Sequence, residues 1–119
     1  LVGRVRNDAL RHRLEEVDLG RYDITMPRDP FAIETVEIEM HLYGSLPRYR
    51  QAEVAEMLEQ RSHRLRHDTL IAVRSSSPED FTDPDLSDLR QRLLAVTNSL
   101  LEEPSIQSIG FHQIRFIRQ

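Results

Sequence analysis

The stretch TVEIEMHLYG, residues 35–44, decides the fold class because its apolar and polar residues alternate without a break. In an extended chain, alternate residues point to opposite sides. The apolar side consists of Val36, Ile38, Met40 and Leu42. This period of two is typical of a strand that packs one face on a core and exposes the other to water. We therefore expect a sheet with one open face.

After Pro47 the apolar residues change to helical spacing. Within residues 53–65 the apolar residues line one side of a helix, and glutamates stand near its start. This pattern predicts a helix of about four turns. The next segment, HDTLIAVRSSS (residues 67–77), suits a buried helical turn or a short buried strand, and we favour the helix. Ser77 followed by Pro78, with Asp80 three residues after Ser77, predicts a capped single turn.

A further helix is predicted to start at Thr82 or Asp83 and to end before Pro104. Its apolar residues recur at spacings of three and four, namely Leu86, Leu89, Leu93, Val96 and Leu100. The closing segment, residues 106–118, has strand-like composition, but its alternation of apolar and polar residues breaks near His112. Either both faces of this last strand are covered, or a bulge interrupts it.

The first part of the chain has a weaker pattern. In residues 1–20, Leu10, Leu14 and Val17 have helical spacing and Gly20 stands where a helix would stop, so we expect a short helix or a linker there. Residues 21–26, RYDITM, form the first expected strand. The predicted fold is a single α+β domain over residues 21–119, with the order strand, strand, helix, helix, helix, strand, and three to four strands packed by three helices.

Composition excludes several classes of function. A chain of 119 residues fits one domain, and its net charge of −4 disfavours general nucleic-acid binding. The absence of cysteine excludes disulfides, thiolate zinc sites and cysteine nucleophiles. With only four glycines in the chain, a phosphate-cradling loop is not expected. No run approaches the roughly 18 apolar residues of a membrane span.

Two groups of polar residues have the residue types of a catalytic or metal site. His63 and His67 are four residues apart, as in some zinc sites, but arginines lie between them and no ligand follows at a helical spacing, so we expect no metal. Glu37, Glu39 and His41 share the wet side of one strand, which is also what a solvated strand face predicts. Residues 75–77, three serines, are expected to form a loop and a helix cap. We predict no catalytic residues, no cofactor and no small-molecule substrate.

The densest basic cluster consists of Arg61, Arg64 and Arg66, with Arg48 and Arg50 upstream. Positive charge near the C-terminal end of a helix complements the helix dipole, and this is the simpler interpretation. Arginine also recognises carboxylate and phosphate groups. The alternative is therefore that Arg61, Arg64 and Arg66 bind an acidic protein partner or a lipid headgroup.

The second half of the chain, residues 67–119, resembles the C-terminal part of the flagellar basal-body-associated FliL family. In that family a helix of the type RDTLIxxLSSxTxEDL leads into a second helix that carries an Asn, and a closing strand ends at or near a C-terminal Gln. Residues 68–77 and 79–81, Asn98 and Gln119 occupy those places. The strand at 35–44 and the helix after it also match, so the resemblance covers about residues 20–119.

The resemblance implies a periplasmic domain with a fold like that of the stomatin/prohibitin/flotillin (SPFH) module, anchored in the bacterial inner membrane by one upstream span. Because the chain begins at Leu1 rather than Met, we expect the segment before it to hold that anchor. The implied role is a non-enzymatic scaffold that assembles as a ring, associates with the flagellar stator and supports motility. The alternatives are an SPFH-like membrane scaffold unrelated to flagella and a small metal-binding or enzymatic domain based on His41, His63 and His67.

Overall fold

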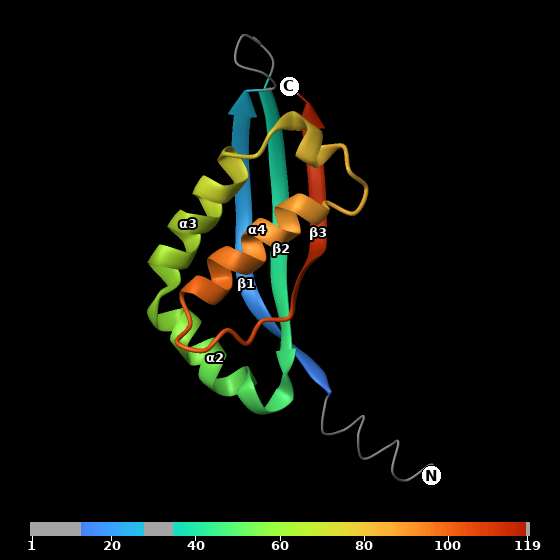
Figure 1. Cartoon of the computed structure of the whole chain (residues 1–119). Helices are drawn as coiled ribbons and strands as arrows, with labels where there is room; N and C mark the ends of the chain where they lie inside the picture. Colours follow the sequence, from blue (N-terminus) through green and yellow to red (C-terminus); the bar gives the residue numbers. More distant parts are fainter. Residues whose placement is uncertain (1–12, 28–34, 119) are drawn as a thin grey trace, which may run out of the picture.

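The described part of the chain forms an α+β domain, in which two strands come before the helices in the sequence and a third strand comes after them (Figure 1). The computed structural model describes residues 13–27 and 35–118. The elements are β1 (Leu14–Pro27), β2 (Thr35–Pro47), α2 (Arg48–Gln60), α3 (Ser62–Arg74), the 3-10 helix η1 (Pro78–Phe81), α4 (Ser87–Ser99) and β3 (Ser108–Arg118). The predicted class and the predicted order of elements are both confirmed.

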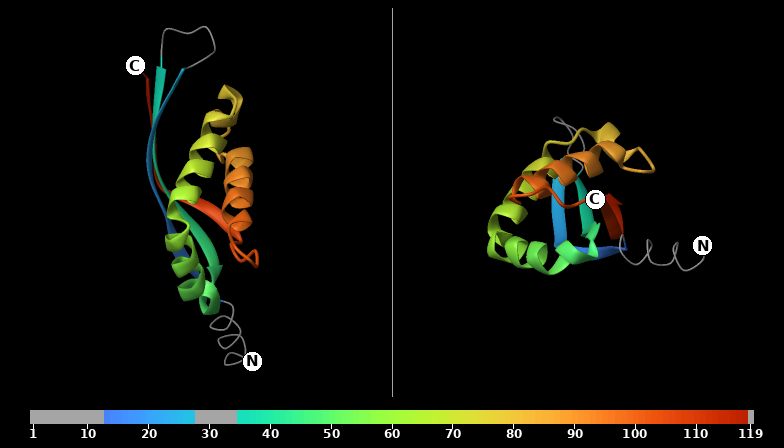
Figure 2. Two further views of the ribbon diagram at one scale, coloured as in Figure 1. Left: turned by 90° about the vertical axis from the view of Figure 1, so that its left-hand side faces the viewer. Right: turned by 60° about the horizontal axis from the view of Figure 1, so that its bottom comes forward.

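The strands form one antiparallel sheet in the order β1-β2-β3, so the middle strand is β2. All the described helices lie on one face of this sheet, and none of the elements in residues 13–27 and 35–118 covers the other face (Figure 2). On β2 the side chains of Ile38, Met40 and Leu42 are buried against the helices, while the residues between them are only half-buried. The alternation in residues 35–44 is therefore confirmed, and the sheet has the expected open face.

The core lies between the sheet and α4, which crosses the covered face (Figure 1). Leu89 and Leu93 of α4 are fully buried, with exposed fractions of 0% and 1%. Just before the helix, Leu86 adopts a left-handed backbone with φ of 52°, a conformation that costs a leucine roughly 1 kcal/mol or more. Its buried side chain offsets this cost by anchoring the start of α4 in the core.

The break in alternation near His112 is a β-bulge. His41 of β2 pairs with Gln113, and the next residue, Leu42, pairs with Phe111, so His112 is the extra residue. A second bulge at Leu19 of β1 lies opposite the same part of β2, and the following Gly20 has φ of +104°, which favours glycine. Bulges increase local twist, and the sheet curves along its length (Figure 2).

The expected helix or linker in residues 1–20 is wrong where the structure describes the chain, because β1 begins at Leu14. Leu10 and the residues around it lie outside the described part. The helical spacing of Leu14 and Val17 is coincidental, since Leu14 is exposed while Val17 is buried, and the bulge at Leu19 interrupts the alternation that would mark the strand. Pairing with β2 decides the conformation, so the sheet begins before the predicted boundary at residue 21.

The helix expected over residues 53–65 is two helices, because the chain bends at Arg61, where φ is −110°. The bend sends α3 along the edge of the sheet beside β1 (Figure 1). The ambiguous segment after His67 continues α3 up to Arg74, so the preference for helix over strand is confirmed.

The capped turn predicted at Ser77 is also confirmed, since Ser77 and Asp80 form a capping box at the start of η1. The next helix, α4, begins at Ser87, later than the predicted start at Thr82 or Asp83. Asp83 still fixes that start, since its carboxylate accepts hydrogen bonds from the backbone N–H groups of Asp85 and Ser87 at 3.1 and 3.0 Å.

One side chain near the end of α4 holds the link to the last strand. Asn98 donates from Nδ2 to the carbonyl of Ile106 and accepts from the backbone N–H of Ile106, both at 3.0 Å. These two hydrogen bonds to the backbone of Ile106 fix the chain just before it enters β3. The backbone N–H of Gln107 then donates to the carbonyl of Ser45 at 2.7 Å, which brings the segment onto β2.

Candidate functional site

The three arginines predicted to contact a partner do not form a single free patch. Arg61 donates to the carbonyl of Leu100, so it ties the α2–α3 bend to the end of α4. Arg66 donates to the carbonyl of Arg21 at 3.1 Å, and its guanidinium carbon lies 5.0 Å from the centre of the Tyr22 ring. Both guanidiniums therefore have structural partners.

Arg64 is different, because 73% of its side chain is exposed and its ion pair with Asp68 is long, at 3.7 Å. Surface pairs of this kind within a helix contribute only about 0.3–0.5 kcal/mol. Arg64 therefore differs from Arg61 and Arg66, whose guanidiniums bond to backbone carbonyls of other elements. His63 and His67 are also exposed on α3. Among the described residues neither belongs to a cluster of three or more metal-ligating side chains.

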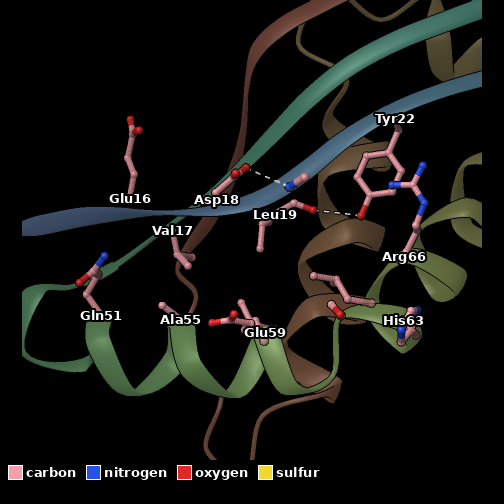
Figure 3. Close-up of a pocket in the computed structure, with 14 residues that line it drawn as sticks. Glu16, Val17, Asp18, Leu19, Tyr22, Gln51, Ala55, Glu59, His63 and Arg66 are labelled. Carbon is pink, nitrogen blue, oxygen red and sulfur yellow. Dashed lines mark hydrogen bonds between the residues drawn. The ribbon is translucent and has the colours of Figure 1, made fainter.

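A groove of about 680 Å³ lies between β1 and the two helices α2 and α3 (Figure 3). Its apolar wall includes Val17, Leu19 and Ala55, and its rim carries carboxylates together with His63 and Arg66. Figure 3 shows that these rim side chains spread along the groove rather than converge on one point.

The edge of β1 that borders this groove is partly closed by side chains. The Tyr22 hydroxyl donates to the carbonyl of Leu19 at 2.9 Å, and the Arg66 guanidinium donates to the carbonyl of Arg21. The N–H of Gly20 donates to Asp18 Oδ1 at 3.0 Å. Since backbone groups at an edge must be free to receive another strand, this stretch of β1 is protected from strand addition.

The open face of the sheet holds the other predicted group, Glu37, Glu39 and His41, and the prediction that these residues share a wet face is confirmed. Each has neighbours on the flanking strands that strand spacing alone could not reveal. His41 Nε2 lies 2.9 Å from Asp18 Oδ1 on β1, and Arg115 on β3 donates to Glu39 at 2.7 Å. The N–H of Gly20, and then His41, hold the pKa of Asp18 below its usual value.

Aromatic rings gather on the same face around the bulge in β3. The His112 ring lies 4.2 Å from that of Tyr43 and 5.3 Å from that of His41, measured between centroids. His112 Nε2 also lies 2.8 Å from a carboxylate oxygen of Glu16 on β1. The Tyr43 ring lies so close over Gly110 that any side chain there would displace it. The bulge therefore serves to place an imidazole over the middle strand.

Three carboxylates crowd together further along the face. Asp23, Glu37 and Glu39 each have an oxygen within 4.8 Å of the others. A shared hydrogen bond with Asp23, followed by the charge of Asp23, raises the pKa of Glu37 above its usual value. The crowding disfavours the ionised form of Glu37 in the folded protein, so it reduces stability at neutral pH.

Replacing Glu37 by glutamine is therefore expected to raise the melting temperature at about pH 7. The gain should shrink as the pH falls through the raised pKa of Glu37, because the native carboxyl then becomes neutral as well. It should vanish below the unfolded value of about 4.3. The measurement is thermal unfolding followed by circular dichroism across this range. Glu39→Gln is the matched control, since it removes the ion pair with Arg115 and should not stabilise. A lower melting temperature for Glu37→Gln at neutral pH would contradict the expectation.

The cross-strand partners Asp18, Asp23, Arg115 and His112 were not anticipated as part of this surface. Asp18 falls in the stretch that was expected to be helix or linker, and the partners on β3 depend on the bulge register. Aligning residues 14–27 with residues 35–47 as a hairpin would have revealed the β1 partners. The correct pairs appear only when a bulge is placed at Leu19.

Comparison with known proteins gives no assignment, since no protein-family model matches the chain and no curated protein is significantly similar to it. Among the helices that the structure describes, none combines the length and the apolar character needed to cross a membrane. The class that the geometry defines is a one-sided α+β domain whose polar residues lie on a broad open surface.

Proposed function

We propose that this chain is a non-enzymatic scaffold domain that acts through its surfaces. More specifically, it is the periplasmic domain of a FliL-like protein of the bacterial inner membrane, where it associates with the flagellar stator and basal body and supports motility as a ring-like assembly. The main support is the order of elements from β2 to β3, strand, helix, helix, helix and strand, which agrees with the family pattern that the sequence resembles.

The contacts on the open face favour a scaffold. His41 with Asp18, His112 with Glu16 and Arg115 with Glu39 form pairs between 2.7 and 2.9 Å. The first and third link β2 to a neighbouring strand, and the second reaches across β2 to join β3 to β1. Catalytic groups instead converge on one position beside a cavity, where a reacting atom can sit within about 3 Å of several of them. Pairs spread over a broad sheet suit recognition of another protein surface, where rim charges set orientation and specificity.

Deletion of the gene in its own bacterium tests the flagellar role. We expect swimming in soft agar to be reduced while filaments still assemble, and we expect the full-length gene to restore swimming. A fluorescent fusion should form foci at flagellar bases. Normal swimming, with the fusion spread evenly over the membrane, would contradict the flagellar role and favour the SPFH-like scaffold outside the flagellum.

The reading frame upstream of Leu1 tests the localisation independently. About 20 apolar residues preceded by arginine or lysine would support an inner-membrane anchor with this domain in the periplasm. A start codon directly upstream without such a run would contradict that localisation.

A further inference from the structure

The open face of the sheet has a negative charge. Among the side chains that the structure describes, it carries five carboxylates and two guanidiniums, which give a net charge of −3 when His41 and His112 are neutral. These are Glu16, Asp18, Asp23, Glu37 and Glu39 against Arg21 and Arg115. The raised pKa of Glu37 reflects the crowding of negative charge at one end of the face. A partner that brings positive charge to this surface would relieve that repulsion.

The outer side of α3 has the opposite charge. Residues 61–74 contain four arginines and one aspartate. The exposed side chains Arg64, His67, Ile71 and Arg74 follow one another at spacings of three and four, so they form one stripe along the helix. Ile71, with 51% of its surface exposed, lies between the two arginines. Below, "α3 stripe" means these four residues.

The two surfaces cannot meet within one molecule. The α3 stripe lies opposite Leu65, Thr69 and Val73, which α3 buries against the rest of the domain. The open face lies on the side of the sheet away from all the helices (Figure 2). Because these complementary surfaces point in different directions, the natural partner for each is the other surface on a second copy of the chain.

We propose that the open sheet face of one copy binds the α3 stripe of a second copy, head to tail. This inference deepens the self-assembly in the proposed function and rests on it. Repetition of such a heterologous contact gives a ring where the rotation closes and a filament where it does not. The contact joins a face to a helix, so it uses neither edge of the sheet.

The charge spacing on the two surfaces agrees. Arg64 and Arg74 are ten residues apart, or about 15 Å along a helix. Asp18 and Asp23 are five residues apart on β1 with one bulge between them, which also amounts to about 15 Å. One arginine can therefore approach exposed Asp18 while the other approaches the crowded carboxylates beside Asp23. His41 lies between these ends on β2, since Tyr43 pairs with Asp18 and Glu39 pairs with Asp23, and its ring is next to those of Tyr43 and His112. In the proposed contact Ile71 packs against these rings.

A charge-swap experiment tests the contact with the complete 119-residue chain. The first variant reverses the α3 stripe with Arg64→Glu and Arg74→Glu, and it leaves the structurally bound Arg61 and Arg66 in place. The second reverses the sheet face with Asp23→Lys and Glu37→Lys, and it keeps the ion pairs of Asp18 and Glu39. A matched control for the second variant, Glu56→Lys with Glu102→Lys, makes the same charge change as that variant at exposed positions outside both surfaces. Circular dichroism checks that each variant is folded.

Self-association is measured by sedimentation velocity over a range of protein concentrations at low and high salt. We expect the wild type and the control to associate, more weakly at high salt, and each reversed variant to associate at least about tenfold more weakly. Mixing the two reversed variants should restore association, since each then offers the charge that the other lacks.

The possible contrary results are distinct. If the reversed variants associate as strongly as the wild type, or if their mixture does not associate, this interface is wrong while self-assembly stands. If the wild type is monomeric at every concentration, both the interface and the self-assembly in the proposed function are wrong.

Discussion

Replacing Asn98 by alanine is expected to lower the free energy of unfolding by about 2–4 kcal/mol. The side chain makes two hydrogen bonds of 3.0 Å to the backbone of Ile106, one as donor and one as acceptor. Ile106 is 95% shielded from solvent, with an exposed fraction of 5%, so alanine leaves a buried N–H and a buried C=O without their partner. Each such group costs roughly 1–3 kcal/mol.

Urea unfolding followed by far-ultraviolet circular dichroism measures this effect. Ser99→Ala is the matched control, because Ser99 is exposed and its hydroxyl bonds only to the carbonyl of Val96 within the same helix. We expect the control to change stability by less than about 0.5 kcal/mol. A loss at Asn98 no larger than that of the control would show that the link to β3 is held by other contacts.

The second large effect is expected for Leu93→Ala, which removes a side chain with 1% exposure from the middle of the core. A leucine truncated at a buried site loses its transfer free energy and leaves a cavity, which together cost about 2–5 kcal/mol. Leu93 packs between α4 and the sheet, two elements joined by many other buried contacts, so the cavity cannot easily collapse.

The same unfolding measurement tests it, with Gln91→Ala on the exposed side of α4 as the control. Leu93→Met should cost less than about 1.5 kcal/mol because it nearly conserves volume. The interpretation of Leu93 as a core residue would fail if the alanine and methionine variants were equally stable.

The sequence predicted the parts of the fold whose pattern is local and regular. The alternation in residues 35–44 identified β2, and the leucine stripe from Leu86 to Leu100 identified the core face of α4. The broken alternation at His112 allowed for a bulge, which the pairing of β2 with β3 confirms. In each case one period of side chains is enough to show which face is buried.

The errors lie where a distant part of the chain decides the conformation. Residues 14–20 form a strand because β2 pairs with them, and the bulge at Leu19 interrupts the alternation that would have marked it. The bend at Arg61 is stabilised by a bond to Leu100, which lies far along the sequence. The same reason explains why only part of the open face was predicted. The sequence pattern places Glu37, Glu39 and His41 on one side of β2, but it does not show which residues of β1 and β3 lie beside them.

The directions of the three strands have a mechanical consequence. β1 and β3 run parallel to each other on the two sides of antiparallel β2, so Leu14 and Arg118 lie at opposite ends of the sheet. Tension applied between these two positions would slide the strands past one another and load the ladder hydrogen bonds together, in shear, instead of opening them one after another. A sheet loaded in this way resists extension much better than one peeled from an end. Pulled in this direction, the sheet would therefore resist extension rather than open from one end.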